Sequence, residues 1–575
     1  MTTHQSLALG FFIAIGLVVG VCGERFEVIS AQQLIKVLDV AKANHFDANI
    51  TLLDDLDFSD SALTLPFGAS SDGSCVSYTG VFEGNGHTIK GLVMNNEDNQ
   101  VYCNAGLFCG LENATFENLV IDSSCSFTGY SAGALSVSLT GSLTAINVTN
   151  KADVSGGSVC GGGFIGMITG LNQRTDVTFK DCVNDGNVIG SSIHGGFVGY
   201  FYRNTDLTMT LSGCTNNANI SGQYVAGGFA GFINSNTNMK IIISNCTNNG
   251  NSTGNQGLGG GFVGFFGDNN DMTISISNIV NNGLITGGTG AGGFLGAMMG
   301  NANTNMTISN SMNNGNCTGT SGCAGGFTGG IMDSNNMTTM ISNSVNTGMM
   351  TGLSGVGGFV GGIGTDPESP FDVFHVLHVI NSVNKGNASA ERFACGLFCV
   401  DPDSAQNMST TVLNSINKGS VNATEYAFGI TNIITKARNV VSMGEFNASS
   451  DSFTFWNAST DANLFFGLDG KCVNCTDDTT LFVHNTNTGF YEVESGEHVH
   501  DLLNAEVEKQ NYGMFWTEEL ELVEAPDYPS PSPSLLPSPS PSSQSGGLSG
   551  GNKHSLSLFL IGVVVALAAH VAMAQ

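Results

Sequence analysis

Positive charge is scarce in this sequence. Lys and Arg together number 17 against 47 Asp and Glu, and charged residues make up only 11% of the chain. Between Lys240 and Lys385 there is no Lys or Arg at all. A protein with a formal net charge of -30 repels phosphate backbones, so we expect no nucleic-acid partner. Long apolar runs are also missing from the whole middle of the chain, and we therefore expect no membrane-spanning segment there.

The first apolar run, residues 7–21, has the length of a signal peptide and is too short to span a bilayer. Small residues at Val21 and Gly23 fit the positions that a signal peptidase reads, so we expect residues 1–23 to be removed before Glu24. The segment before the apolar run lacks Lys and Arg. An uncleaved anchor helix is the alternative.

The second apolar run, residues 556–574, is not followed by the basic residues that hold a spanning helix in place. Small residues precede it, then a mostly polar spacer at 548–555, which is the order of a glycosylphosphatidylinositol (GPI) attachment signal. We expect Ser545 to carry the lipid and residues 546–575 to be removed. Alternative attachment residues are Ser549, Gly550 and Asn552, and a spanning tail is the other possibility. The expected location is the extracellular face of the plasma membrane.

Asn-X-Ser/Thr sequons are consistent with export through the secretory pathway. The 15 sequons are at Asn49, Asn113, Asn147, Asn219, Asn245, Asn251, Asn305, Asn316, Asn336, Asn387, Asn407, Asn422, Asn447, Asn457 and Asn474. An Asn-rich chain also generates sequons by chance, so their number alone says little.

A Gly-Phe-X-Gly motif repeats through the middle of the chain at intervals of 32 or 33 residues. Its phenylalanines are Phe164, Phe197, Phe229, Phe262, Phe294, Phe327 and Phe359. A second motif follows in phase, with Cys182, Cys214 and Cys246 at one position and an asparagine two residues later. Such regularity indicates one structural unit per repeat.

Each unit contains short strands and no room for a helix. In one unit the strands are predicted at 196–201, 207–212 and 218–221, and the middle one alternates apolar and polar residues. The Asn- and Gly-rich pieces between them are typical of turns. Identical short strands at a fixed period predict an all-β fold, a parallel β-helix or solenoid of 32–33-residue coils. Phe should stack on Phe, and roughly ten coils would span on the order of 50 Å.

The repeat resembles the GLUG repeat of secreted and surface proteins. The motif Gly-Phe-X-Gly matches that family's Gly-Leu-Val-Gly, and residues 78–89 (YTGVFEGNGHTI) resemble its entry segment. The resemblance covers about 49–443 and implies a solenoid fold and a role in surface adhesion. Two departures are the Phe in place of Leu and the long unit.

The regions outside the repeats are expected to cap and carry the solenoid. Residues 24–48 form an N-terminal cap with a helix at 30–44, in which Ser30 and Gln33 make a capping box and Leu34, Val37, Leu38 and Ala41 form an apolar stripe. Residues 49–450 are the solenoid body. Residues 451–525 form a C-terminal cap or module with a helix near 500–510. Residues 526–545 alternate Pro and Ser, which predicts an extended stalk.

Cysteines are numerous enough to suggest an oxidising compartment. Local disulfides are predicted for Cys103 with Cys109, Cys395 with Cys399, and Cys472 with Cys475. The stacked Cys182, Cys214 and Cys246 would form either a disulfide with one thiol left over or a buried thiol column.

Metal and cofactor binding are not expected. Cys472 and Cys475 lack two further zinc ligands. His375 and His378, and the histidines in 497–501, are interpreted as parts of exposed polar loops.

An enzyme needs clustered carboxylates, and here they are scattered. They lie at Asp176, Asp181, Asp185, Asp206, Asp268, Asp271 and Asp333. Asp176 and Asp206 could share a face, but no basic residue recurs beside them. We therefore predict no catalytic residue and interpret these acids as solvated turn residues.

The combined expectation is a lipid-anchored surface glycoprotein of a eukaryotic cell. It would be an adhesin or recognition protein for a glycan or another cell's surface, contacting its partner through exposed Asn, Thr and Phe on one solenoid face. The alternatives are a passive, protease-resistant coat protein and, third, a β-helix enzyme acting on polysaccharide.

Overall fold

The computed structural model describes residues 24–442, apart from 44–45, 62, 97–103, 171–173, 365–373, 402–407 and 435. Beyond residue 442 it describes short strands only, of which the last is β59 (Leu522–Glu524). The predicted signal peptide, the helix near 500–510, the stalk and the attachment signal with Ser545 lie outside the described residues. Among the described helices, none has the length and apolarity that crossing a membrane requires.

One coil of the body contains five short strands. These are β16 (Val198–Tyr202), β17 (Leu207–Ser212), β18 (Thr215–Asn216), β19 (Ile220–Gly222) and β20 (Val225–Gly227). The three predicted strands of this unit correspond to β16, β17 and β19, while β18 and β20 were not predicted. Side chains of β17 alternate between buried and half-buried along its whole length, as its alternating sequence dictates.

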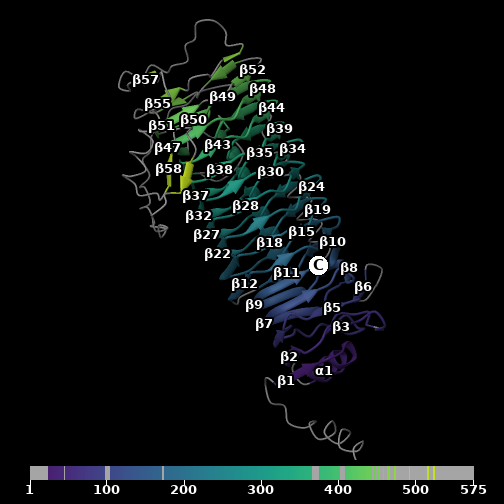
Figure 1. The fold of residues 1–575 in the computed structure, drawn as a ribbon. Helices are drawn as coiled ribbons and strands as arrows, with labels where there is room; N and C mark the ends of the chain where they lie inside the picture. The colour runs from purple at the N-terminus through teal and green to yellow at the C-terminus, as the bar shows by residue number, and fades with distance from the viewer. Residues whose placement is uncertain are drawn as a thin grey trace, which may run out of the picture.

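Each strand pairs in parallel with the equivalent strand of the next coil. β17 pairs with β22 (Thr237–Ser244), so that Met209 lies opposite Ile241 and Leu211 opposite Ile243. Repetition of this pairing gives a parallel β-solenoid of about 11 coils with about 33 residues each, which confirms the predicted fold class. Figure 1 shows the coils as one elongated stack that begins at the helix α1 (Ala31–Ala43).

The helix α1 lies at the N-terminal end of the stack, as predicted. The strand before it, β1 (Arg25–Val28), pairs in parallel with β2 (Asn49–Leu52), so the sheet already includes the residues on both sides of the helix. The Ser30 hydroxyl accepts a hydrogen bond from the Gln33 N–H at 3.3 Å and begins the helix. Leu34 and Leu38 are buried against the first coil, which keeps the open edge of the stack away from other chains.

The repeated phenylalanines form a column inside the solenoid. Ring centroids lie 4.7 Å apart between Phe197 and Phe229 and 4.8 Å apart between Phe229 and Phe262. All seven repeat phenylalanines are buried, so the prediction that Phe contributes to an exposed contact face is wrong. The glycine before each Phe is required by close backbone approach: a Cβ at Gly228 would lie 2.0 Å from the Gly261 carbonyl oxygen.

A column of buried asparagines runs beside the phenylalanines. It consists of Asn150, Asn184, Asn216, Asn248, Asn281, Asn313, Asn346, Asn384 and Asn417, each fully buried. The amide nitrogens of the first eight donate to the amide oxygen of the next coil at 2.7–3.0 Å, and Asn417 donates to the Gly429 carbonyl instead. Each also donates to a carbonyl two residues further on, as from Asn281 to Gly283 at 3.1 Å. The column therefore satisfies polar groups in the middle of an apolar core.

Replacing an interior member of this column should destabilise the solenoid. Asn281→Ala leaves the Asn248 donor and the Asn313 acceptor buried and unpaired, which costs about 2 kcal/mol or more. We expect a lower midpoint in urea unfolding followed by circular dichroism. The matched control is Asn282→Ala, because Asn282 is exposed and its amide bonds Asn249 on the outside of the same turn. Equal effects of the two substitutions would contradict the structural role assigned to the buried column.

Candidate functional site

An outer face, here named the hydroxyl face, is formed by the longest strand of each coil. Its strands include β17, β22, β27 (Asn270–Ser277), β32 (Ala302–Ser309) and β37 (Asn335–Ser342). In-register pairing aligns Ser212, Ser244, Ser277 and Ser309 in one half-buried outward column, which ends at the buried Ser342. Thr273 and Asn305 lie beside them and are exposed. The face therefore presents hydroxyl and amide groups at about 4.8 Å intervals, interrupted by Lys240, Ile242 and Met340 on its outward side.

A second apolar cluster, here named the outer trough, lies outside the main core. It consists of Cys160, Ile193, Tyr200, Val225, Phe232, Leu258, Phe265, Ala297, Cys323 and Met332. The trough forms at the corner that the Gly-Phe motif makes in each coil. There the strand before the motif, such as β20, and the strand after it, such as β21 (Ala230–Asn234), turn the side chains that do not enter the main core toward each other, as Val225 and Phe232 do. Rings stack along it, with centroids 5.3 Å apart between Tyr200 and Phe232. Tyr202 and Tyr224 are half-buried at its margins.

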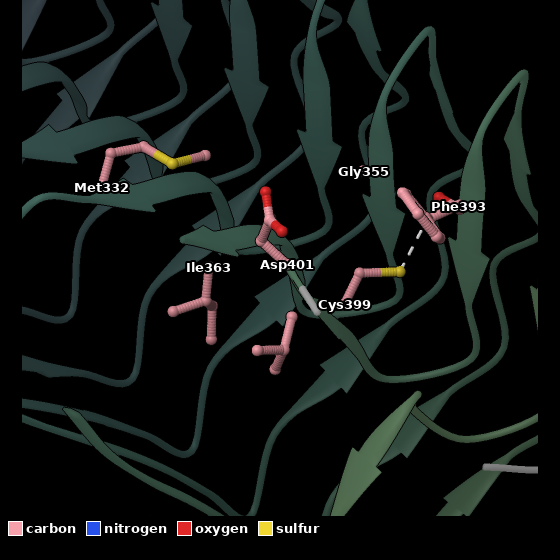
Figure 2. Close-up of a pocket in the computed structure, with 8 residues that line it drawn as sticks. Met332, Gly355, Ile363, Phe393, Cys399 and Asp401 are labelled. Atoms are coloured by element: carbon pink, nitrogen blue, oxygen red, sulfur yellow. Dashed lines mark hydrogen bonds between the residues drawn. The ribbon is translucent and has the colours of Figure 1, made fainter. Parts of the chain in front are cut away.

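Side chains on one wall of the trough shrink along the stack. The register aligns Tyr200, Phe232, Phe265, Ala297, Gly330 and Gly362. At Gly362 no side chain fills the wall, and a small notch remains in the trough (Figure 2).

This notch is lined by Met332, Gly355, Gly362, Ile363, Phe393, Cys399, Val400 and Asp401. Its space for water-sized molecules is about 20 Å³, which is room for about one water. Among these eight lining residues Asp401 alone is charged. The notch is therefore too small for a sugar and carries one carboxylate, whereas glycoside hydrolysis uses two.

The scattered carboxylates are divided between turns and strands. Asp176 lies in β12 (Thr175–Lys180) and Asp271 in β27, and Asp333 is buried, so the interpretation of these three as solvated turn residues is wrong. Asp181, Asp206, Asp268, Asp271 and Asp333 all adopt positive φ, the left-handed conformation that Asp and Asn tolerate.

Asp176 lies opposite Thr208 in the sheet and pairs with Arg174 at 2.9 Å. Asp206 instead accepts a hydrogen bond from Asn238. Within the described ranges no group of three or more His, Cys, Asp or Glu side chains could hold a metal ion.

The structure corrects one predicted disulfide. Cys109 bonds Cys75, with Cα atoms 5.9 Å apart, so its pairing with Cys103 is wrong. The two cysteines are 34 residues apart, and one turn of the solenoid brings them together. The predicted bond between Cys395 and Cys399 is confirmed. Cys103, Cys475 and the side chain of Cys472 lie outside the described residues.

Cys182, Cys214 and Cys246 form a buried column of free thiols, the second of the two predicted arrangements. The Cys246 sulfur donates to the Ser244 carbonyl at 3.2 Å. Further along, serines occupy the same column, and the Ser311 hydroxyl donates to the Ser309 carbonyl at 2.7 Å. Contact with Cys214 and burial together raise the pKa of the Cys182 thiol, which is therefore protonated at neutral pH. The thiols thus act as hydrogen-bonding equivalents of serine.

Cys214→Ser should therefore fold with little loss of stability. In the denatured, unreduced protein we expect its count of reactive thiols to fall by one relative to wild type. If Cys214 were bridged to a neighbour, the substitution would instead release that neighbour and raise the count by one. Titration with a coloured disulfide reagent in denaturant separates the two outcomes.

Two histidines are buried in the body. His375 begins β42 (His375–Ile380) and is only 4% exposed, so its interpretation as part of an exposed loop is wrong. His378 also lies in this strand rather than in a loop, and is half-buried. Burial lowers the pKa of His375 to about 4, and burial likewise lowers the pKa of His194 to about 4. The His194 Nε2 lies 2.9 Å from the Gly156 carbonyl oxygen.

These lowered pKa values make stability depend on pH. The unfolded chain binds protons as pH falls through about 6.5, whereas the folded chain does so only near pH 4. The stability contributed by keeping His375 neutral is therefore complete above pH 6.5 and is lost as pH falls to 4. The pKa difference corresponds to about 3 kcal/mol for this one residue.

His375→Met should reduce the loss of stability between pH 6.5 and 4, because methionine does not titrate. Methionine should fit this position, since Met337 and Met408 occupy it in the neighbouring coils. The measurement is the urea midpoint at several pH values. His378→Met, in the same strand and half-buried, is the control. An unchanged pH slope in His375→Met would show that the buried ring does not titrate as described.

The sequons lie on the outside of the described solenoid. Exposed sequon asparagines are Asn113, Asn147, Asn219, Asn245, Asn251, Asn305, Asn316, Asn336, Asn387 and Asn422. Asn49 and Asn447 are half-buried. Asn407, Asn474 and the side chain of Asn457 lie outside the described residues. Alternation of buried and exposed residues in each strand explains why these asparagines differ from the buried column.

Comparisons with known proteins add little to this geometry. No protein-family model matches the chain, and no curated protein matches it. Among solved structures it is similar to one described as a "putative immunoglobulin A1 protease from Bacteroides ovatus", at 12% identity and a TM-score of 0.19. The alignment covers 87% of this chain and 92% of that one. At this TM-score the likeness carries no argument about activity.

Proposed function

We propose that this protein is a GPI-anchored glycoprotein of a eukaryotic cell surface that acts as an adhesin or recognition protein. The observation that carries the proposal is the hydroxyl face, on which four serines align in register and Thr273 and Asn305 are exposed. A long regular array of this kind suits contact with an extended or multivalent partner such as a surface glycan, because many weak contacts add up. The resemblance to GLUG repeats, proteins linked to surface adhesion, supports the same role.

Display outside the cell is supported by the ends of the sequence. The apolar run at 7–21 has the features of a signal peptide, and the order of small residues, spacer and apolar tail after Ser545 fits lipid attachment. The Pro/Ser segment 526–545 would hold the solenoid away from the bilayer. Ten exposed sequons on the described body support passage through the secretory pathway.

A passive coat is the second candidate. It is favoured by the absence of Lys and Arg between Lys240 and Lys385, which denies trypsin-like proteases a cleavage site over several coils. Activity on polysaccharide is the third candidate. It is less favoured because five of the acids have the left-handed backbone conformation, and Asp176 is paired with Arg174.

The anchor is tested first on cells that display the full chain. Treatment with a phosphatidylinositol-specific phospholipase should release the protein into the medium. A protein that stays on the cells would contradict the anchor, provided that a known anchored protein on the same cells is released.

The released protein then tests adhesion on a glycan array and on intact cells. We expect saturable binding to a restricted set of ligands, and we expect Thr273→Lys on the hydroxyl face to weaken it. Thr286→Lys is the matched control, because it places the same charge on another strand, β29 (Ile285–Gly287), of the same coil. Absence of binding to every glycan and cell tested would favour the passive coat protein. Turnover of an arrayed polysaccharide would favour the polysaccharide-active enzyme.

A further inference from the structure

One outer turn of the solenoid alternates sequon asparagines with apolar residues. In successive coils the turn residues are Asn251, Leu284, Asn316, Met349 and Asn387. Each lies directly before a short strand, and these five strands are equivalent in successive coils. They are β24 (Ser252–Gly254), β29, β34 (Cys317–Gly319), β39 (Met350–Gly352) and β44 (Ala388–Ala390). Several of these strands are labelled along one edge in Figure 1. Their in-register pairing stacks the five turn residues at about 4.8 Å intervals.

The three asparagines in this column are held in one orientation. The Asn251 amide oxygen accepts from the Leu284 N–H at 2.9 Å, and the Asn316 oxygen accepts from the Met349 N–H at 2.9 Å. The Asn387 oxygen accepts from the Ser420 N–H at 2.8 Å. Within the described part of the chain, none of the three amide nitrogens has a hydrogen-bond partner. All three side chains are exposed, so the nitrogens face solvent.

The two apolar residues between them are unusually accessible. Leu284 is 46% exposed and Met349 is 47% exposed, although most large apolar side chains of the solenoid are buried. Each is flanked on both sides by a sequon asparagine at about 4.8 Å. A group attached to the neighbouring amide nitrogens would therefore lie beside each apolar side chain.

We propose that Asn251, Asn316 and Asn387 carry N-linked glycans, and that the first sugar of each glycan covers Leu284 and Met349. In the transfer, the amide nitrogen gives up a proton to the surrounding water and bonds to C1 of N-acetylglucosamine on a lipid-linked oligosaccharide donor. The donor's C1–O bond breaks, and its pyrophosphate leaves with the electron pair. The amide oxygen takes no part in the new bond, so the hydrogen bond to the next coil is kept. The ring face and N-acetyl methyl of the sugar supply the apolar cover.

The proposal rests on the proposed function only in that the chain must enter the secretory pathway. Expression with a heterologous signal peptide in a eukaryotic host removes that dependence. Failure of adhesion or of lipid anchoring would then leave this inference standing, and failure of this inference would leave adhesion to be judged by its own binding experiment.

Glycan occupancy is measured by peptide mass mapping of the full chain. We expect Asn251, Asn316 and Asn387 to be occupied. Thr253→Ala, Thr318→Ala and Ser389→Ala should each remove one glycan while leaving the asparagine and its backbone hydrogen bond in place. Thr253→Ser, Thr318→Ser and Ser389→Thr keep the sequon and are the matched controls. Three unoccupied asparagines in a folded, secreted protein would overturn the proposal.

Sugar cover is measured with a fluorescent dye that binds exposed apolar surface. Trimming the glycans to the first N-acetylglucosamine with an endoglycosidase should leave dye binding unchanged. The triple alanine variant, which lacks the three glycans, should bind more dye, and adding Leu284→Ser and Met349→Ser should abolish that increase. No increase in the triple variant would overturn the covering role.

Discussion

Parallel in-register stacking is the constraint on which the rest of this structure depends. Equivalent residues lie about 4.8 Å apart, so each side chain must tolerate a copy of itself above and below. Rings stack and amides pair, because an amide carries a donor and an acceptor, whereas a charge repels its copy at this distance. The buried asparagine column and the phenylalanine column are two of the solutions used here. The same constraint accounts for the scarcity of charge in the repeats.

The fold was predictable because the sequence motif recurs at a fixed spacing. The side-chain contacts between coils could not be predicted, because they depend on the register of the strands. The spacing from Phe164 to Phe359 was sufficient to predict the solenoid. Asn281 and its equivalents looked like turn residues, because asparagine is usually exposed, and only the path of the coil shows that they point inward. The sequence suggests pairing Cys109 with its neighbour Cys103, since it does not reveal that a full coil brings Cys75 into bonding distance. The burial of His375 was not predictable from its own sequence, because this histidine replaces methionine in a buried column.

The three candidate surfaces of the solenoid differ in their chemistry. The hydroxyl face is polar and regular, the outer trough is filled by its own aromatic rings, and the notch at the end of the trough is of water size. The sequence indicated neither the trough nor the notch, because both arise where two arms of a coil face each other. On the described residues a partner would therefore meet the regular hydroxyl face and a notch of water size, which favours recognition over many coils.

The buried amide column also bears on how such a molecule changes over generations. Every interior coil presents the same amide donor to the coil after it and the same acceptor to the coil before it. Duplicating or deleting one whole unit in the gene would leave every remaining junction chemically intact. Unequal recombination between repeats would then alter the reach of the protein in steps of about 4.8 Å while keeping the amide column continuous.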